Sequence, residues 1–223
     1  MRLSSRLKSY VDTRNLQLAI RNSQPVTPLK YFVLNKPYDV LSQFTKEIPS
    51  HQTLGDCYDF PPEVYSVGRL DRDSEGLLIL TNDNRLKHRL LDPTFRHQRT
   101  YLVQVENIPT AEAIANLQKG VKIRINKKFY KTLPAQAMHL QEAPTLPERN
   151  PPIRKRKHIP TAWIQLSLRE GKNRQVRRMC AAVGFPVLRL LRTSIEGLTL
   201  GDLEIGGVKE LSKAEIYSLL ALG

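Results

Sequence analysis

Short apolar runs, some continuous and some alternating with polar residues, predict several β-strands along the chain. The alternating segments are TYLVQVE (100–106), VKIRI (121–125) and AWIQLSLR (162–169), and the continuous ones are YFVL (31–34), VYSV (64–67) and LLILT (77–81). Trp163 is expected to lie in the core. Because proline cannot donate a hydrogen bond to a sheet, Asn35-Lys36-Pro37 is predicted to end the first strand in a turn, with Lys36 solvated.

Other segments carry helix caps ahead of residues with helical spacing. They are a helix through Leu91 behind Asn82-Asp83, a helix over TAEAIANLQKG (110–120) capped by Thr110, and a final helix behind a Ser212–Glu215 capping box. Gly206-Gly207 is predicted to turn a hairpin before that last helix. Strands outnumber helices without regular alternation, so the predicted class is α+β, with a mostly antiparallel or mixed β-sheet flanked by helices and loops.

The excess of positive charge predicts a polyanionic partner. The 223 residues carry 35 Lys+Arg against 21 Asp+Glu, a net charge of +14 that favours phosphate binding through counterion release. An anionic membrane is the competing explanation, but no apolar run approaches the about 18–20 residues of a spanning helix, and no apolar signal segment opens the chain. Cys57 and Cys180 form no CxxC pair, which fits two buried thiols in a reducing cytoplasm.

Two segments concentrate positive charge outside the predicted elements. Residues 1–30 have weak periodicity and are predicted to be a basic extension, with one folded domain over residues 31–223. Residues 143–160 carry five prolines and five Lys/Arg, and proline at this density predicts an extended basic loop. Four of its cations, which we expect to bind the polyanionic partner, are Arg154, Lys155, Arg156 and Lys157.

The stretch GRLDRDSEGLLILTND (68–83) places three carboxylates, Asp71, Asp73 and Glu75, ahead of a buried strand. Their spacing imitates the first half of a calcium-binding EF-hand loop. The twelfth position, however, is Asn82 rather than Glu, and the flanks are strands rather than helices. The loop is therefore a solvated turn or a site at which one carboxylate reacts. The histidines are scattered without a ligand pair, so no metal site is expected.

A second charged segment, LREGKNRQVRRMCAAVGF (168–185), is predicted to form a helix from the cap Asn173 to Val183. Its apolar face consists of Val176, Met179, Cys180 and Val183. Arg174 and Arg178 lie on the opposite face and should meet solvent or phosphate. Arg177 lies at the edge of the apolar face, where its guanidinium can turn inward, pair with a half-buried carboxylate and keep it ionised.

Four stretches of the chain, taken in order, resemble motifs of the RsuA-type pseudouridine synthases of bacterial rRNA. They are YFVLNKPYDVLSQF, GRLDRDSEGLLILTND, RTYLVQVE and EGKNRQVRRMCAAVGFPVLRLLR, so the resemblance runs from about Tyr31 to the last helix. ERNPPIRKRKHIPTAW resembles the E-type members, which modify a uridine of large-subunit rRNA. Many members begin with a separate RNA-binding domain, for which residues 1–30 are too few.

The resemblance implies roles for particular residues. The catalytic carboxylate falls on Asp71, the aromatic that stacks on the flipped uracil on Tyr101, and the apolar residue that packs against the base on Leu190. The basic partner of the catalytic carboxylate falls on Arg177, which leaves Asp73 and Glu75 with roles in solubility or phosphate positioning at most. Tyr101 has a plain alternative, because an aromatic in a period-two strand is usually core. Candidates for backbone phosphates are Arg69, Arg174, Arg178 and Arg192.

The reaction that the resemblance implies breaks the N1–C1′ bond of uridine, rotates the base and rejoins it through C5. An ionised carboxylate can add to a sugar or base carbon, or take the C2′ proton, without a metal or a small-molecule cofactor. The sequence thus predicts a cytoplasmic, monomeric pseudouridine synthase acting on large-subunit ribosomal RNA. The alternatives are a non-catalytic rRNA-binding or ribosome-assembly protein, and a synthase for another RNA such as tRNA.

Overall fold

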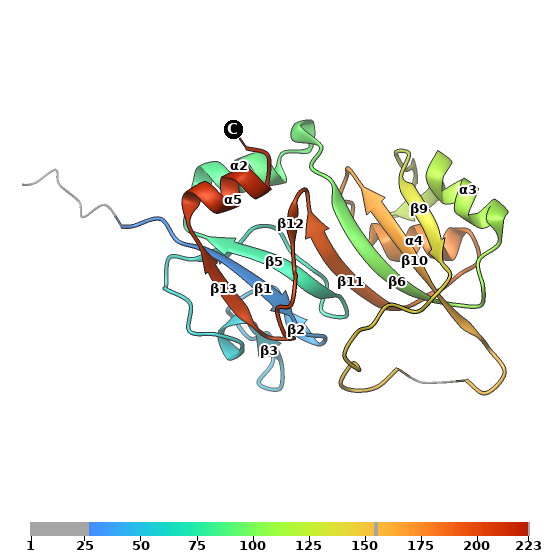
Figure 1. Cartoon of the computed structure of the whole chain (residues 1–223), viewed down its shortest axis with the longest axis horizontal. Coiled ribbons are helices and arrows are strands. Elements are labelled where there is room, and N and C mark those ends of the chain that lie inside the picture. The colour runs from blue at the N-terminus through green and yellow to red at the C-terminus, as the bar shows by residue number, and fades with distance from the viewer. Residues whose placement is uncertain (1–26, 154–155, 223) are drawn as a thin grey trace, which may run out of the picture.

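A mixed sheet runs through the molecule in the computed structural model, which describes residues 27–153 and 156–222 (Figure 1). Its strands, in spatial order, are β13 (Val208–Leu211), β1 (Tyr31–Lys36), β5 (Glu75–Thr81), β11 (Val187–Ile195), β6 (Arg99–Glu106), β10 (Thr161–Leu168) and β9 (Gln136–Leu140), with β12 (Leu198–Thr199) beside β11 and β4 (Tyr65–Ser66) beside β5. The predicted α+β class with a mixed sheet is confirmed. The predicted extension lies outside the described residues up to position 26, as do Arg154 and Lys155.

The remaining elements are short and surround this sheet. Two further strand pairs are the parallel β2 (Val40–Leu41) and β3 (Gln52–Thr53), and the antiparallel hairpin of β7 (Lys122–Ile125) and β8 (Lys128–Lys131). The helices are α2 (Asn84–Leu91), α3 (Ala111–Lys119), α4 (Gln175–Ala182) and α5 (Lys213–Leu219), with 3₁₀ turns at η1 (Leu54–Asp56) and η2 (Pro93–Phe95). No helix of the described ranges has the length and apolarity needed to cross a bilayer.

The sheet consists of two antiparallel halves joined by one short parallel contact. Strands β13, β1 and β5 form the first half, and β11, β6, β10 and β9 form the second. Between the halves, β5 and β11 pair in parallel through Leu191 opposite Glu75 and Arg192 opposite Gly76. Gly76 has φ +101°, and a Cβ there would lie 2.2 Å from the Arg192 carbonyl oxygen, so the close approach of the two strands requires glycine.

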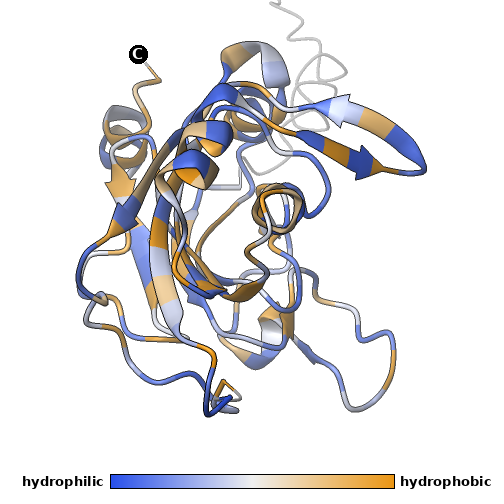
Figure 2. Ribbon diagram, turned by 90° about the vertical axis from the view of Figure 1, so that its right-hand side faces the viewer, coloured by the Kyte–Doolittle hydropathy of each residue, from blue (hydrophilic) through white to orange (hydrophobic). Residues whose placement is uncertain are grey.

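The first half carries two hydrophobic clusters, one on each face of β1 and β5, the second half carries a third, and each half has its own helices. Leu86 of α2 and Ile216 of α5 pack with β1 and β5 residues in the first half, whereas Leu117 of α3 and Met179 of α4 pack with β6 and β10 residues in the second. Figure 1 shows α2 and α5 together over one end of the molecule and α3 and α4 at the other. The β7–β8 hairpin, with hydrophilic and hydrophobic residues alternating along it, projects beyond the body (Figure 2).

Three of the caps predicted from local sequence, those of α2, α3 and α5, are confirmed. Asp83 accepts hydrogen bonds from the backbone N–H groups of Arg85 and Leu86 at the start of α2. Thr110 accepts one from Ala113 at the start of α3, and Ser212 forms a complete capping box with Glu215 at the start of α5. Such caps satisfy backbone donors that a helix leaves free, and their signals lie within four residues of sequence.

The first predicted turn is wrong in one respect, because β1 continues through Asn35 and Lys36. Lys36 is fully buried rather than solvated. Its Nζ donates hydrogen bonds of 2.8 Å to the Pro37 carbonyl and 2.7 Å to the Val40 carbonyl. Burial lowers the pKa of Lys36 to about 8, and the nearby acidic groups, which raise this pKa, offset the effect of burial only in part. Carbonyls contributed by the following loop thus hold a lysine that local sequence assigns to the surface.

Other predictions differ from the structure in extent or topology. Gly206-Gly207 forms a turn but no hairpin, because β12 pairs with β11 and β13 pairs with β1. The predicted strand VYSV is shorter, since only Tyr65–Ser66 pairs with β5. Trp163 is buried as predicted, and both thiols are free, with Cys180 buried but Cys57 only partly so.

Candidate active site

A cleft of about 900 Å³ opens where the two halves of the sheet meet. The first half contributes the loop before β5, including Arg69, Asp71 and Ser74, and the second contributes Tyr101 of β6 and Leu190 of β11. Arg174 and Arg192 also line this cleft. Three of the four predicted catalytic residues therefore share one cavity, although they lie far apart in sequence.

The backbone on both sides of Asp71 is fixed by the segment that follows β1. Ser42 Oγ donates to the Leu70 carbonyl at 2.8 Å and accepts from the Leu70 N–H at 3.1 Å. On the other side, the Arg72 carbonyl accepts from the Asp39 N–H at 2.9 Å, and the Arg72 side chain pairs with the Asp39 carboxylate at 2.7 Å. Asp71 itself remains half-buried, so a fixed backbone presents a partly accessible carboxylate to the cleft.

The arginines of α4 pair with Asp73, which corrects the partner predicted for Arg177. Arg177 Nε lies 3.3 Å from Asp73 Oδ2, and its Nη2 donates to the Asp73 carbonyl at 2.6 Å. Arg174 binds both oxygens of Asp73, at 3.0 and 2.8 Å, and its Nη1 lies 3.6 Å from Asp71 Oδ2. The inward arginine that helix geometry predicts is present, but its carboxylate is two residues further along the loop.

Asp73 therefore has a structural role that the sequence interpretation denied it. Burial raises the pKa of Asp73, but the hydrogen bonds of Arg174 and the charges of Arg177 and Arg174 outweigh this effect and hold the pKa below its ordinary value. Asp73 stays ionised and anchors the start of α4 to the loop that carries Asp71.

Glu75 is likewise a buried structural residue and not part of a solvated loop. Both of its oxygens accept from Arg189 of β11, with Nε–Oε2 at 2.9 Å and Nη2–Oε1 at 2.8 Å. The remaining Nη1 donates to the Pro147 carbonyl at 2.9 Å, which ties the proline-rich loop to the sheet. The pair spans the contact between β5 and β11, so it holds the two halves together beneath the cleft.

Tyr101 and Arg192 are direct neighbours across β6 and β11. Tyr101 is half-buried and packs against the core of the second half while it lines the cleft, so both predicted roles describe part of its environment. Arg192 is 5% exposed, and its Nε donates to the Leu77 carbonyl at 2.8 Å. Its Nη2 is buried and finds no hydrogen-bond partner among the described residues.

Helix α4 begins at Gln175, behind Arg174 in the left-handed conformation, and not behind the predicted cap Asn173. Gln175 takes over the local hydrogen bonding, because its Oε1 accepts from the Lys172 N–H at 2.9 Å. Arg178, a predicted phosphate ligand, donates to the Asn173 carbonyl and side chain and to the Arg124 carbonyl. The Arg178 guanidinium therefore donates to acceptors within the protein rather than facing a phosphate, and it joins α4 to β7.

The other predicted cations lie at different depths. Arg69 is exposed at the cleft, and its Nη2 donates to Gln43 Oε1 at 3.2 Å. Neither Arg156 nor Lys157 lines the cleft. Arg156 pairs with Glu106 at 3.2 Å, and Lys157 is exposed. Ser42 and Asp39, which fix the Asp71 loop, were missed; the only local signal was their place in the motif that follows β1.

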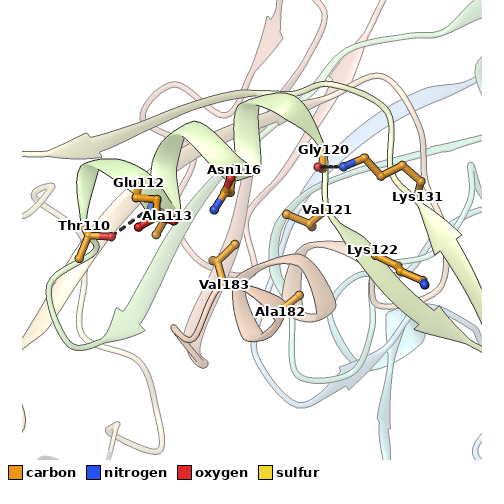
Figure 3. Close-up of a pocket in the computed structure, with 10 residues that line it drawn as sticks. All are labelled: Thr110, Glu112, Ala113, Asn116, Gly120, Val121, Lys122, Lys131, Ala182 and Val183. Carbon is orange, nitrogen blue, oxygen red and sulfur yellow. Dashed lines mark hydrogen bonds between the residues drawn. The ribbon is translucent and has the colours of Figure 1, made fainter.

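A second cavity, of about 530 Å³, lies between α3, the β7–β8 hairpin and the end of α4 (Figure 3). Figure 3 shows Lys131 reaching across its rim to the Gly120 carbonyl. None of the predicted catalytic residues lines it.

A mixed sheet whose central cleft combines a fixed carboxylate, an accessible aromatic ring and several arginines defines a class of protein: an enzyme that acts on a base within a nucleic acid chain. Residues 30–182 match the RNA pseudouridylate synthase family, and the chain belongs to that family. The predicted family and enzyme class are thereby confirmed.

Named relatives agree with this membership. The chain is 52% identical over 164 residues to a protein of Xanthomonas axonopodis pv. citri (strain 306) named ribosomal large subunit pseudouridine synthase E, covering 73% of this chain and 84% of that one. It is 48% identical over 194 residues to the protein of the same name from Vibrio vulnificus (strain CMCP6), covering 86% and 79%. A crystal structure of a pseudouridylate synthase superposes with a TM-score of 0.70 at 28% identity, over 87% of this chain and 75% of the other.

Proposed function

We propose that this chain isomerises a uridine of large-subunit ribosomal RNA to pseudouridine, with Asp71 as the catalytic carboxylate. The observation that carries the proposal is the meeting of Asp71, Tyr101 and Leu190 in one cleft at the junction of the two halves. The substrate class is supported by the names of the two relatives and by the net charge of +14.

Each residue has a task that its position suits. The target uridine leaves its stack and enters the cleft, where the Tyr101 ring offers a stacking platform and Leu190 an apolar surface. The Asp71 carboxylate then adds to a sugar or base carbon, or takes the C2′ proton, while the N1–C1′ bond breaks and C5 becomes the glycosyl carbon. Arg174, 3.6 Å from Asp71, supplies the counter-charge in place of the predicted Arg177.

The arginines divide into those that face the cleft and those that support it. Arg69 is exposed in the cleft and is placed to contact a phosphate that flanks the flipped nucleotide, whereas Arg192 lines the cleft from a buried position. Arg177 and Arg178, whose guanidinium groups bind Asp73, Asn173 and the Arg124 carbonyl, act through the position of α4. The proline-rich loop with Arg156 and Lys157 supplies further charge outside the cleft.

We also propose that the enzyme works as a monomer in the cytoplasm without a small-molecule cofactor, with residues 31–223 as the catalytic domain and residues 1–30 as a basic extension. Two free thiols fit a reducing compartment. Sedimentation of the protein with and without RNA would test the monomer.

The test uses rRNA transcripts with tritium at uridine C5, which is lost to water when C5 becomes the glycosyl carbon. We expect the wild type and the Asp202→Asn control, altered at an exposed carboxylate between β12 and β13, to release tritium from large-subunit transcripts. Asp71→Asn should bind the same transcripts and release none.

Three results would overturn the proposal in different ways. Tritium release by Asp71→Asn at the wild-type rate would remove Asp71 from the chemistry. Release from tRNA but not from large-subunit rRNA would change the substrate. Tight binding without release from any RNA would leave an RNA-binding or ribosome-assembly protein.

A further inference from the structure

The β7–β8 hairpin and its flanks form the most one-sided charged surface that the site does not use. Between Lys119 and Gln141 there is no Asp or Glu. The cations of this stretch, all of them exposed, are Lys119, Lys122, Arg124, Lys127, Lys128 and Lys131. We call the segment from Lys122 to Lys131 the basic hairpin.

No carboxylate of the described chain forms an ion pair with a cation of the basic hairpin. Some exposed cations elsewhere have such partners, as Lys46 has with Asp56 at 2.9 Å. Within the hairpin, Lys122 lies directly opposite Lys131, and like charges at such positions destabilise a strand pair. A bound polyanion would relieve this repulsion.

An aromatic ring stands among these charges. Phe129 is 68% exposed, more than any other large hydrophobic residue of the described chain, and Lys122 Nζ lies 4.3 Å from the centre of its ring. Exposed aromatic rings beside cations are the combination that single-stranded RNA uses, since bases stack on the ring while phosphates meet the charges. An acidic protein surface would match the charges but lacks the planar bases that stack on such a ring.

The hairpin continues the wall of the cleft. Glu170, which lines the cleft, accepts from the Tyr130 hydroxyl at 2.6 Å and from the Leu133 N–H at 2.8 Å. Lys172, also a cleft residue, places its Nζ 5.2 Å from the centre of the Tyr130 ring. RNA that leaves the cleft past Lys172 therefore meets the base of the hairpin, whose tip projects outward (Figure 2).

We propose that the basic hairpin binds the RNA strand that flanks the target nucleotide, with Lys127 and Lys128 on phosphates and Phe129 stacked on an unpaired base. The inference rests on the proposed function in so far as the substrate is RNA. It assigns the chain a second contact region outside the cleft.

The first experiment uses the wild-type protein and measures how fast individual lysines react with an amine-specific reagent, with and without a large-subunit rRNA transcript. We expect RNA to slow the reaction at Lys127 and Lys128 but not at Lys209 and Lys213, which are exposed near the opposite end. Unchanged rates at Lys127 and Lys128 would overturn the proposal. Protection at Lys172 reports separately on the cleft.

The second experiment compares matched double variants. Lys127→Gln/Lys128→Gln should reduce the slope of log binding constant against log salt concentration by about 1.5, whereas Lys209→Gln/Lys213→Gln should leave it unchanged. Phe129→Ala should weaken binding to an unstructured transcript about tenfold. Equal slopes for the two double variants would contradict the proposal. If the hairpin variant changes the salt dependence of binding but the wild type releases no tritium from any RNA, the hairpin proposal stands and the proposed isomerase activity fails.

Discussion

Glu75 and Arg189 form a two-pronged ion pair beneath the cleft, with side chains 3% and 6% exposed. Because one residue begins β5 and the other lies in β11, the pair fastens the two halves of the sheet at their short parallel contact. Removing one partner leaves the other charge buried and unpaired, which is far more destabilising than replacing both.

We therefore expect Arg189→Met to lower the free energy of unfolding by about 3–5 kcal/mol, measured by urea denaturation. The double variant Glu75→Leu/Arg189→Met should recover much of this loss, since no unpaired charge remains. Equal stabilities of Arg189→Met and the wild type would show that water reaches Glu75.

Asp73 gives an acid-dependent contribution to stability. Its pKa is held below the ordinary value in the folded protein, so its contribution is fully present above the unfolded pKa and is lost as the pH falls through the folded one. Asp73→Asn should cost about 1 kcal/mol at pH 7, because the pair is partly exposed. The difference from the wild type should shrink towards pH 2 in urea titrations; a constant difference would contradict an ionised Asp73.

Lys36 gives a second pH-dependent contribution to stability, on the alkaline side. Its folded pKa of about 8 lies below the 10.5 of the unfolded chain, so the unfolded state binds more protons between these values and stability rises with pH. Relative to Lys36→Met, the wild type should gain about 3 kcal/mol between pH 8 and 10.5. Denaturation of both proteins across this range measures the gain, and parallel curves would refute it.

Gly76 is expected to tolerate no side chain. A Cβ would lie 2.2 Å from the Arg192 carbonyl oxygen at a φ of +101°, so Gly76→Ala should destabilise the protein by about 3 kcal/mol. Gly171→Ala is the control, because a Cβ there meets no atom within 4 Å. Thermal unfolding that shifts equally for both variants would argue against the close strand contact.

Substitutions at Tyr101 distinguish stacking on the target base from packing in the core. Tyr101→Phe keeps the ring and should retain tritium release within a few-fold, whereas Tyr101→Ala should reduce it about 10- to 100-fold through the loss of base stacking. Unfolding curves of both variants control for the contribution of Tyr101 to the core. Equal activity of the alanine variant would assign Tyr101 to the core alone.

Local signals account for the parts of the fold that the sequence predicts. The caps at Asp83, Thr110 and Ser212 act within a few residues, and the alternation in β6 and β10 follows their two faces. Strand β11 carries no such signal, because the run VLRLLRTSI lies between β5 and β6 with buried residues on both faces. Its two buried arginines also give it the composition of a surface segment.

The site shows the same division. The position of Arg177 on α4 predicts its inward direction, but Asp71 and Asp73 are two residues apart, and only the path of the loop decides which of them it meets. Lys36 and Glu75 were misassigned for a related reason. Their partners are the Val40 carbonyl and Arg189, which tertiary structure brings to them and no local pattern announces.

Because β5 and β11 join the two halves of the sheet through a two-residue parallel contact, the proposed site forms only when the two halves come together. Asp71 lies in one half of the sheet and Tyr101 and Leu190 lie in the other, so neither half alone contains the proposed set of catalytic residues. A substitution that weakens the β5–β11 contact would abolish activity while the hydrophobic clusters of both halves stay packed. During refolding, the circular-dichroism signal of the separate halves would return before the activity.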